Sequence, residues 1–66
     1  MVKAGSRIKD NDPRMYTRVL TVREVLQNGV VAVDSVGRSF RILLRRIHTD
    51  GKLRRSGFDL LPQSDN

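Results

Sequence analysis

The dipeptide Asn28-Gly29 constrains the fold most, because it places a tight-turn signal between two apolar runs. Residues 16–26 (YTRVLTVREVL) before it alternate in the way of a strand, and residues 30–34 (VVAVD) after it are short and β-branched. An Asn-Gly pair in this setting favours a two-residue type I′ turn, in which both central residues have positive φ. The pattern predicts an antiparallel hairpin at the centre of the fold.

Residues 16–26 give the strongest strand signal in the chain. One predicted face of this strand carries its large apolar side chains, namely Tyr16, Leu20, Val22 and Leu26. The alternation is imperfect at Arg18, Glu24 and Val25. A bulge or strong bend near Arg23-Glu24 explains such a break, because a bulge adds one unpaired residue to a strand.

Three further segments are predicted to be strands. Residues 2–8 (VKAGSRI) form a first strand with a bend at Gly5-Ser6, residues 39–44 (SFRILL) alternate well, and residues 58–61 (FDLL) form a short closing strand. Turn-forming residues separate these segments at positions 9–14 (KDNDPR), 35–38 (SVGR) and 50–51 (DG).

Residues 39–48 fit two secondary structures. A helical stripe also runs through this segment, at Phe40, Leu43, Leu44 and Ile47, with Ser39 as its cap and Gly51 at its end. The strand-like segments before it need a further strand to complete a barrel. We therefore predict a strand to Leu44 and one helical turn over Arg45–His48 that carries Ile47 into the core, with a helix over 39–48 as the alternative.

The chain has 66 residues and no cysteine, which sets its domain organisation. One domain over residues 1–61 is expected, followed by a disordered tail at 62–66 (PQSDN) that begins at Pro62. Neither disulfides nor a thiolate metal site can form. No apolar run approaches the roughly 18 residues that a membrane span needs, so a soluble, cytoplasmic protein without membrane contact is expected.

The positive charge is concentrated in residues 37–55 (GRSFRILLRRIHTDGKLRR). This stretch contains seven basic residues and one acidic residue, Asp50, so it alone accounts for the net charge of +6. Arginine holds phosphate through a planar fork, and neutralised phosphates release counterions. The candidate contacts for nucleic acid or an acidic partner are Arg38, Arg41, Arg45, Arg46, Lys52, Arg54 and Arg55.

The residues that catalysis requires are scarce. His48 is the only histidine and lies among arginines, and no phosphate-binding loop of the GxxxxGK type is present. Asp10 and Asp12 have the spacing of a divalent-metal pair, but nothing nearby supplies further oxygen ligands. Loop chemistry, with ion pairs from Asp10 or Asp12 to Arg14 or Arg18, is favoured for them instead. We therefore expect no enzyme, no cofactor, no metal and no small-molecule substrate.

The order of these segments resembles the small SH3-like barrels of the KOW and Tudor group. The resemblance rests on VKAGSRI, the long bent strand YTRVLTVREVL, the Asn-Gly hairpin, and GRSFRILLRRI followed by FDLL. The series DNDPR, R-x-L-x-V and G-R-x-x-R-I is also similar to small uncharacterised proteins of bacteriophages and prophages. The resemblance implies an all-β, five-stranded SH3-like barrel with a short helical turn before the last strand.

Two functions fit this barrel. The first is a basic binding module that contacts the backbone of DNA or RNA without strong sequence specificity. Base reading is not favoured, because single-strand readers expose aromatic rings, whereas Phe40 and Phe58 are expected to be buried and only Tyr16 free. The alternative is a protein-interaction barrel, a phage or prophage accessory protein that binds an acidic host protein or a second copy through an edge strand and the basic patch.

Overall fold

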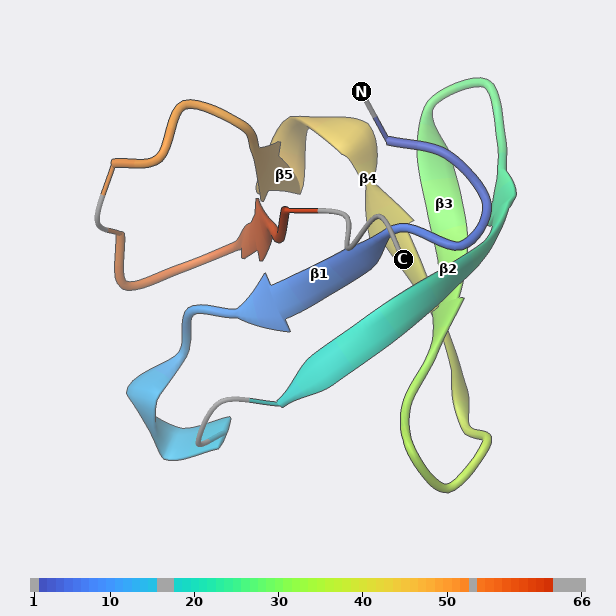
Figure 1. Cartoon of the computed structure of the whole chain (residues 1–66), viewed down its shortest axis with the longest axis horizontal. Helices are drawn as coiled ribbons and strands as arrows, with labels where there is room; N and C mark the ends of the chain where they lie inside the picture. Colours follow the sequence, from blue (N-terminus) through green and yellow to red (C-terminus); the bar gives the residue numbers. More distant parts are fainter. Residues whose placement is uncertain (1, 16–17, 53, 63–66) are drawn as a thin grey trace.

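One curled sheet dominates the computed structural model, which describes residues 2–15, 18–52 and 54–62 (Figure 1). Its strands, in chain order, are β1 (Arg7–Asp10), β2 (Val19–Val25), β3 (Gly29–Val33), β4 (Ser39–Leu43), β5 (Ile47–His48) and β6 (Phe58–Leu60). Two short 3-10 helices accompany them, η1 (Pro13–Met15) and η2 (Leu44–Arg46). The predicted all-β class is therefore confirmed.

The strand order in the sheet is β4-β3-β2-β1-β6-β5. Neighbouring strands are antiparallel except β5 and β6, which are parallel. The two strands at the ends of this order, β4 and β5, are joined along the chain by η2 alone. That short connection requires the sheet to curl into a half barrel, which Figure 1 shows. The sheet has six strands where five were predicted, a minor difference caused by the two-residue strand β5.

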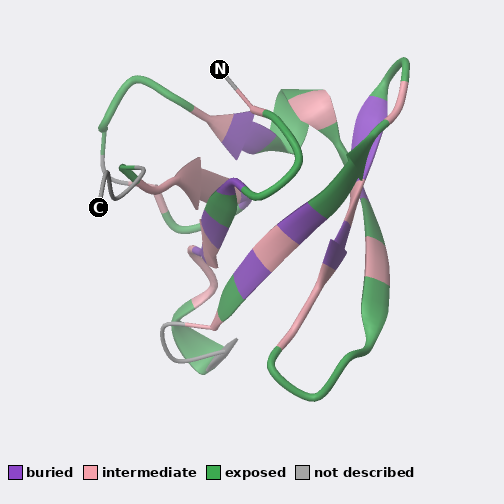
Figure 2. Ribbon diagram, turned by 45° about the vertical axis from the view of Figure 1, so that its right-hand side comes forward, coloured by how far each residue is buried: buried purple, intermediate pink, exposed green. Residues whose placement is uncertain are grey.

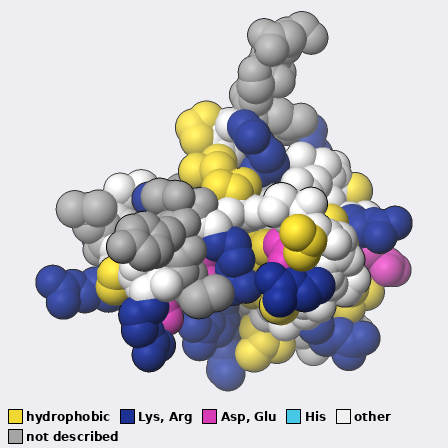
Figure 3. All heavy atoms as spheres, turned by 90° about the horizontal axis from the view of Figure 1, so that it is seen from below, with side chains coloured by type: hydrophobic (Ala, Val, Ile, Leu, Met, Phe, Trp, Pro, Cys, Tyr) yellow, Lys and Arg dark blue, Asp and Glu magenta, His cyan; other side chains and the backbone are white. Residues whose placement is uncertain are grey.

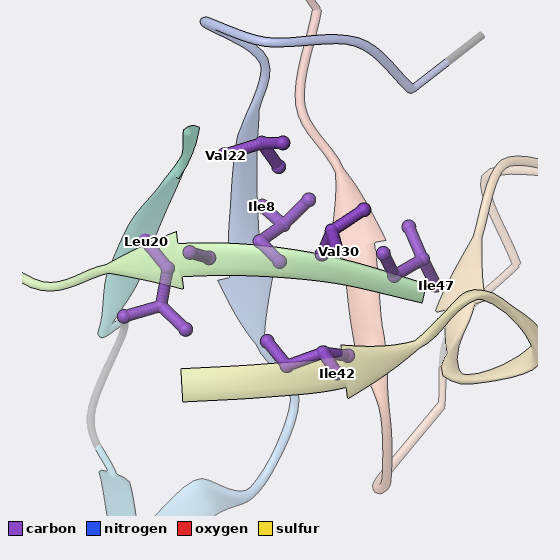
Figure 4. Packing of buried hydrophobic residues seen from close by; sticks show 7 residues of the cluster. Ile8, Leu20, Val22, Val30, Ile42 and Ile47 are labelled. Carbon is purple, nitrogen blue, oxygen red and sulfur yellow. The ribbon is translucent and has the colours of Figure 1, made fainter. Parts of the chain in front are cut away.

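The core lies on the inner face of the curl. Along β1 and β2 buried residues alternate with more exposed ones, as expected for strands with one solvated face (Figure 2). Figure 4 shows the labelled side chains meeting between the strands. The buried set is Ile8, Leu20, Val22, Val30, Ala32, Ile42 and Ile47. The predicted inward positions Leu20 and Val22 are confirmed, whereas Tyr16 lies outside the described residues.

The central hairpin is confirmed, but its turn is displaced by one residue. The Leu26 N–H donates to the Gly29 carbonyl oxygen at 2.7 Å, so Gln27 and Asn28 form the loop. Gly29 is the first residue of β3 and is not among the glycines with positive φ, so the predicted type I′ turn centred on Asn-Gly is wrong. A Cβ at Gly29 would lie 2.5 Å from the Ile42 carbonyl oxygen, so close approach of β4 requires glycine here.

The predicted bulge in β2 is confirmed, because the register with β3 shifts between Val22 and Glu24. The ambiguity over residues 39–48 is resolved in favour of a strand, and the helical alternative is wrong. The helical turn begins at Leu44, one residue earlier than predicted, and it ends at Arg46. Ile47 then enters the core from β5, as predicted for its side chain.

The first strand starts later than predicted. Ala4 and Gly5 form a turn that is closed by a bond of 2.9 Å from the Ser6 N–H to the Lys3 carbonyl oxygen. Gly5 has a φ of +93°, and the Lys3 N–H donates to the Ser6 hydroxyl oxygen at 3.0 Å. β1 then runs on through Asp10, into the stretch predicted as a turn. Of the predicted tail at residues 62–66, Pro62 is described and exposed, and residues 63–66 lie outside the described residues.

None of the helical segments in the described residues has the length and apolar character that crossing a bilayer requires.

Candidate functional site

The open side of the half barrel carries a groove between β4 and β6. We call it the seam groove, and its volume is about 340 Å³. Apolar side chains from both strands line it together with three arginines, the full set being Arg18, Phe40, Arg41, Ile42, Leu43, Arg46 and Phe58. Phe40 and Phe58 were predicted to be buried, but both are only partly buried and belong to this lining. The sheet does not close here, so the two rings are left at its seam.

Two further grooves adjoin η2. The first has a volume of about 280 Å³ and is lined by Arg45, Arg46, His48, Ser56 and Gly57. The second has a volume of about 490 Å³ and is lined by Gln27, Asn28, Leu43, Leu44 and Arg45. Arg45 belongs to both of these grooves, and Arg46 belongs to the first and to the seam groove. The two arginines of η2 therefore stand where the three grooves meet.

Local sequence explains why η2 presents its arginines outward. Leu43 precedes η2 with extended backbone, and the Leu44 N–H donates to the Asn28 carbonyl oxygen at 2.9 Å, which fixes the start of η2 against the central hairpin. Ile47 after it is buried in the core. With both ends held, the residues between them face solvent, and Arg45 and Arg46 are exposed.

Arg18 is a site residue that the sequence prediction missed. Its guanidinium carbon lies 4.8 Å from the centroid of the Phe40 ring, within the range of a cation–π contact. Its Nη2 donates to Asp10 Oδ2 at 2.6 Å, in an ion pair whose side chains are 23% and 8% exposed. Among the described residues no hydrogen-bond acceptor meets the buried Arg18 Nε. The alternation of the strands indicates this position. Arg18 is two residues from Leu20, and Asp10 is two residues from Ile8, so both lie on the inward face.

Two of the predicted contact residues are neutralised by neighbouring acids. Arg38 Nε donates to Asp34 Oδ2 at 2.9 Å in the turn between β3 and β4. Arg54 donates to Asp50 through two bonds of 2.7 Å each. The Lys52 backbone N–H also donates to Asp50 Oδ1, at 3.1 Å, and within the described residues the Lys52 side chain forms no ion pair.

These acids titrate below their ordinary range. Hydrogen bonds from the Arg54 side chain and then from the Lys52 backbone lower the pKa of Asp50. Partial burial alone would raise the pKa of Asp34, but bonds from the backbone and side chain of Arg38 outweigh it and lower the pKa. Hydrogen bonds from the Arg14 side chain and backbone likewise lower the pKa of Asp12. All three carboxylates are therefore held charged by the turns that they cap.

The other predicted contacts divide into two places. Arg41 lies on β4, and Arg45 and Arg46 on η2, while Lys52 and Arg55 lie in the loop before β6. These five side chains are exposed, and none forms an ion pair within the described part of the chain. Arg38 is at the opposite end of β4 from η2, so it is not brought together with Arg45 and Arg46. Figure 3 shows that basic side chains are widely spread, with few acidic ones among them.

His48 packs against Gly57 at the edge of the loop. A Cβ at Gly57 would lie 2.6 Å from His48 Nε2 and 2.6 Å from the Arg46 carbonyl oxygen, so the contact requires a glycine, whose φ is +74°. The predicted ion pairs of the Asp10 and Asp12 region are confirmed, with Arg18 and Arg14 respectively. In residues 2–15, 18–52 and 54–62 no group of three or more potential metal ligands is found.

The sequence matches no known family model, and comparison with curated proteins and with solved structures finds no significant match. The resemblance to the KOW and Tudor group, and to small phage and prophage proteins, therefore stays a prediction.

Proposed function

We propose that this chain is a small SH3-like barrel that binds the phosphate backbone of DNA or RNA through Arg41, Arg45 and Arg46. The proposal is one of binding without catalysis and without strong sequence preference. The strand order, with η2 joining the two ends of the curled sheet, supports the barrel. The function rests on the arrangement around η2.

The observation that carries the function is the position of Arg45 and Arg46 where three grooves meet. Among the described residues, no acidic side chain lines any of these grooves, and neither arginine forms an ion pair. A guanidinium that is exposed and unneutralised loses little on binding phosphate and gains a bidentate contact. Arg38 and Arg54 contribute less under this proposal, because each must first leave a carboxylate.

The size of the salt effect follows from the number of phosphates contacted. Three arginines that neutralise about three phosphates give a slope of log affinity against log salt of about −2 for a single strand. A charged surface with no defined contacts would instead respond to net charge alone. Defined contacts and general attraction by net charge can be told apart by making the same change of charge at another place on the surface.

The test is a mobility-shift series over salt concentration with generic DNA and RNA. Arg45→Glu/Arg46→Glu should abolish the shift at salt concentrations where the unchanged protein still binds. The matched control is Arg7→Glu/Arg23→Glu, which alters two exposed arginines on β1 and β2 and lowers the net charge by the same amount. Equal loss in both variants, or no shift of the unchanged protein even at low salt, would overturn the proposal.

A second candidate function has one observation in its favour. β4 is the last strand of the sheet order, so one of its edges has no neighbouring strand among the described residues, and Leu43 on it is 43% exposed. An extended segment of an acidic protein, or β4 of a second copy, could add to this edge. Light scattering tests the second-copy form: a discrete dimer that Leu43→Glu dissociates supports it, and a monomer at all concentrations contradicts it.

A further inference from the structure

The seam groove differs from the other two grooves in the chemistry of its lining. Among the described lining residues of the three grooves, phenyl rings occur only in this one, at Phe40 and Phe58, together with aliphatic Ile42 and Leu43. The same lining includes Arg18, Arg41 and Arg46, and no acidic side chain among the described residues belongs to it. Phosphate binding alone does not need such a floor. A ligand that uses the whole groove must carry a flat apolar group together with negative charge.

Charge in the seam groove is unevenly neutralised. Arg18 forms an ion pair with Asp10, and its guanidinium lies against the Phe40 ring, so its charge is largely neutralised within the protein. Arg41 and Arg46 have no ion pair within the described residues and are exposed. The groove therefore combines two available cations with phenyl rings in one lining, and its positive charge favours an anionic ligand.

We propose that the seam groove takes one unpaired nucleobase of a single-stranded nucleic acid, with the adjoining phosphates on Arg41 and Arg46. This inference rests on the proposed function and names its ligand class. A volume of about 340 Å³ is near the lower end for ligand sites and suits one planar ring system. Bases in a duplex are stacked and paired, so their faces cannot enter such a groove.

The stacking surfaces come from two elements that the core holds firmly. Phe58 begins β6, in register with Ile47 on one side and Asp10 on the other, and it packs against the hydrophobic core. Phe40 is in register with buried Ala32 and supports the Arg18 guanidinium. Both a phenyl ring and a guanidinium plane accept a base by stacking. Little ordering of the protein is needed, which lowers the entropic cost of binding.

The apolar lining of the seam groove also favours nucleic acid over an acidic peptide. A carboxylate-rich peptide satisfies arginines but brings no flat ring to Phe58. A single strand supplies a flat face at every nucleotide and a phosphate beside each face, which is the combination that stacking grooves with basic rims recognise. Binding of an acidic peptide is therefore the alternative that the experiment must distinguish.

The experiment compares three fluorescent probes by anisotropy at one low salt concentration. They are an oligothymidylate of about 8 nucleotides, an abasic strand of the same length, and an oligoglutamate of the same charge. The unchanged protein should bind the intact strand about 5- to 150-fold more tightly than the abasic strand, since stacking of one base on an aromatic ring has that magnitude. It should bind the oligoglutamate no better than the abasic strand.

Phe58→Leu should lower the affinity for the intact strand to that for the abasic strand. The matched control is Leu60→Val, on the same strand and packed against the same core, but outside the groove lining. This control should keep the full preference for the intact strand. Circular dichroism shows whether each variant is folded, and the comparison of probes with the unchanged protein decides the question even if Phe58→Leu does not fold.

The possible failures are distinguishable. Equal binding of intact and abasic strands would overturn the base site while leaving backbone binding in place. Oligoglutamate bound as tightly as the intact strand would also overturn it, in favour of an acidic peptide. No binding of any probe at low salt would overturn both the base site and the proposed function.

Discussion

The two sides of the half barrel are built differently. On the side formed by β1, β2 and β3, the core residues Ile8, Leu20, Val22, Val30 and Ala32 are at most 1% exposed. On the side where β4, η2 and β6 meet, apolar residues such as Phe40, Leu44, Phe58 and Leu60 are only partly buried. The first side supplies most of the burial that holds the fold. The second leaves apolar surface and arginines at the seam, and it is the side on which we propose binding.

The largest loss of stability should come from opening a cavity on the side formed by β1, β2 and β3. Leu20→Ala removes a fully buried side chain and should lower the free energy of unfolding by about 2–5 kcal/mol, enough to unfold much of so small a domain. Leu60→Ala, at a partly buried position on the open side, should cost clearly less. Urea unfolding followed by circular dichroism measures both, and equal losses would contradict the difference between the two sides.

The next effect concerns the ion pair beneath the seam groove. Asp10→Asn leaves the Arg18 guanidinium without its carboxylate, and because Arg18 is 23% exposed we expect a loss of about 1–3 kcal/mol rather than the full cost of a buried charge. Arg18→Met in the same chain should recover part of this loss. If the double variant is as unstable as the sum of the single variants, the pair does not act as a unit.

A smaller loss of stability should distinguish a glycine that is required by a close contact from one that is required only by its positive φ. Gly29→Ala forces a methyl group to within 2.5 Å of the Ile42 carbonyl oxygen and should cost about 1–3 kcal/mol by pushing β4 away. Gly37→Ala meets no atom within 4 Å and should cost only about 1 kcal/mol, from its φ of +87°. Thermal unfolding of the two variants tests this ranking. The reverse order would mean that β4 moves away from the hairpin easily.

The smallest effect is the response to acid. The pKa values of Asp12, Asp34 and Asp50 are lower in the folded chain than their ordinary value of 3.8. Their stabilisation is therefore complete above that value and is lost as the pH falls below it. Unfolding midpoints should be level at neutral pH and decline below about pH 4. Asp34→Ala should weaken this decline, whereas Glu24→Gln, which changes an acid with no ion pair in the described residues, should leave it unchanged.

Alternation along the chain was sufficient to predict the all-β class and the bulge in β2. It was also sufficient to place Leu20 and Val22 in the core, because inward and outward positions follow from period two. Ile47 was placed in the core by the helical turn predicted after the strand, which breaks that period. Asn28-Gly29 marked the hairpin but not the geometry of its turn. The reason for Gly29 is a contact with Ile42, far along the sequence, which no local rule describes.

The candidate site was less accessible to prediction. Charge density along residues 37–55 identified Arg45 and Arg46, but it also included Arg38 and Arg54, whose acids lie four residues away. The i, i+4 spacing was visible in the sequence, although only the turns bring the groups together. The aromatic floor was missed because burial of Phe40 and Phe58 was inferred from alternation alone. How far a curled sheet closes depends on all its strands at once.

The most direct test of the claim that the open side binds is to map contacts residue by residue. Backbone amide shifts of the isotopically labelled protein would be followed as an oligothymidylate is added. We predict that the largest changes fall on residues 41–46 and on Phe58, with little change at Thr21 and Val33 on the outer face of β2 and β3. Changes centred on the Arg38 turn or on the loop of Lys52, or spread evenly over the basic surface, would contradict the account.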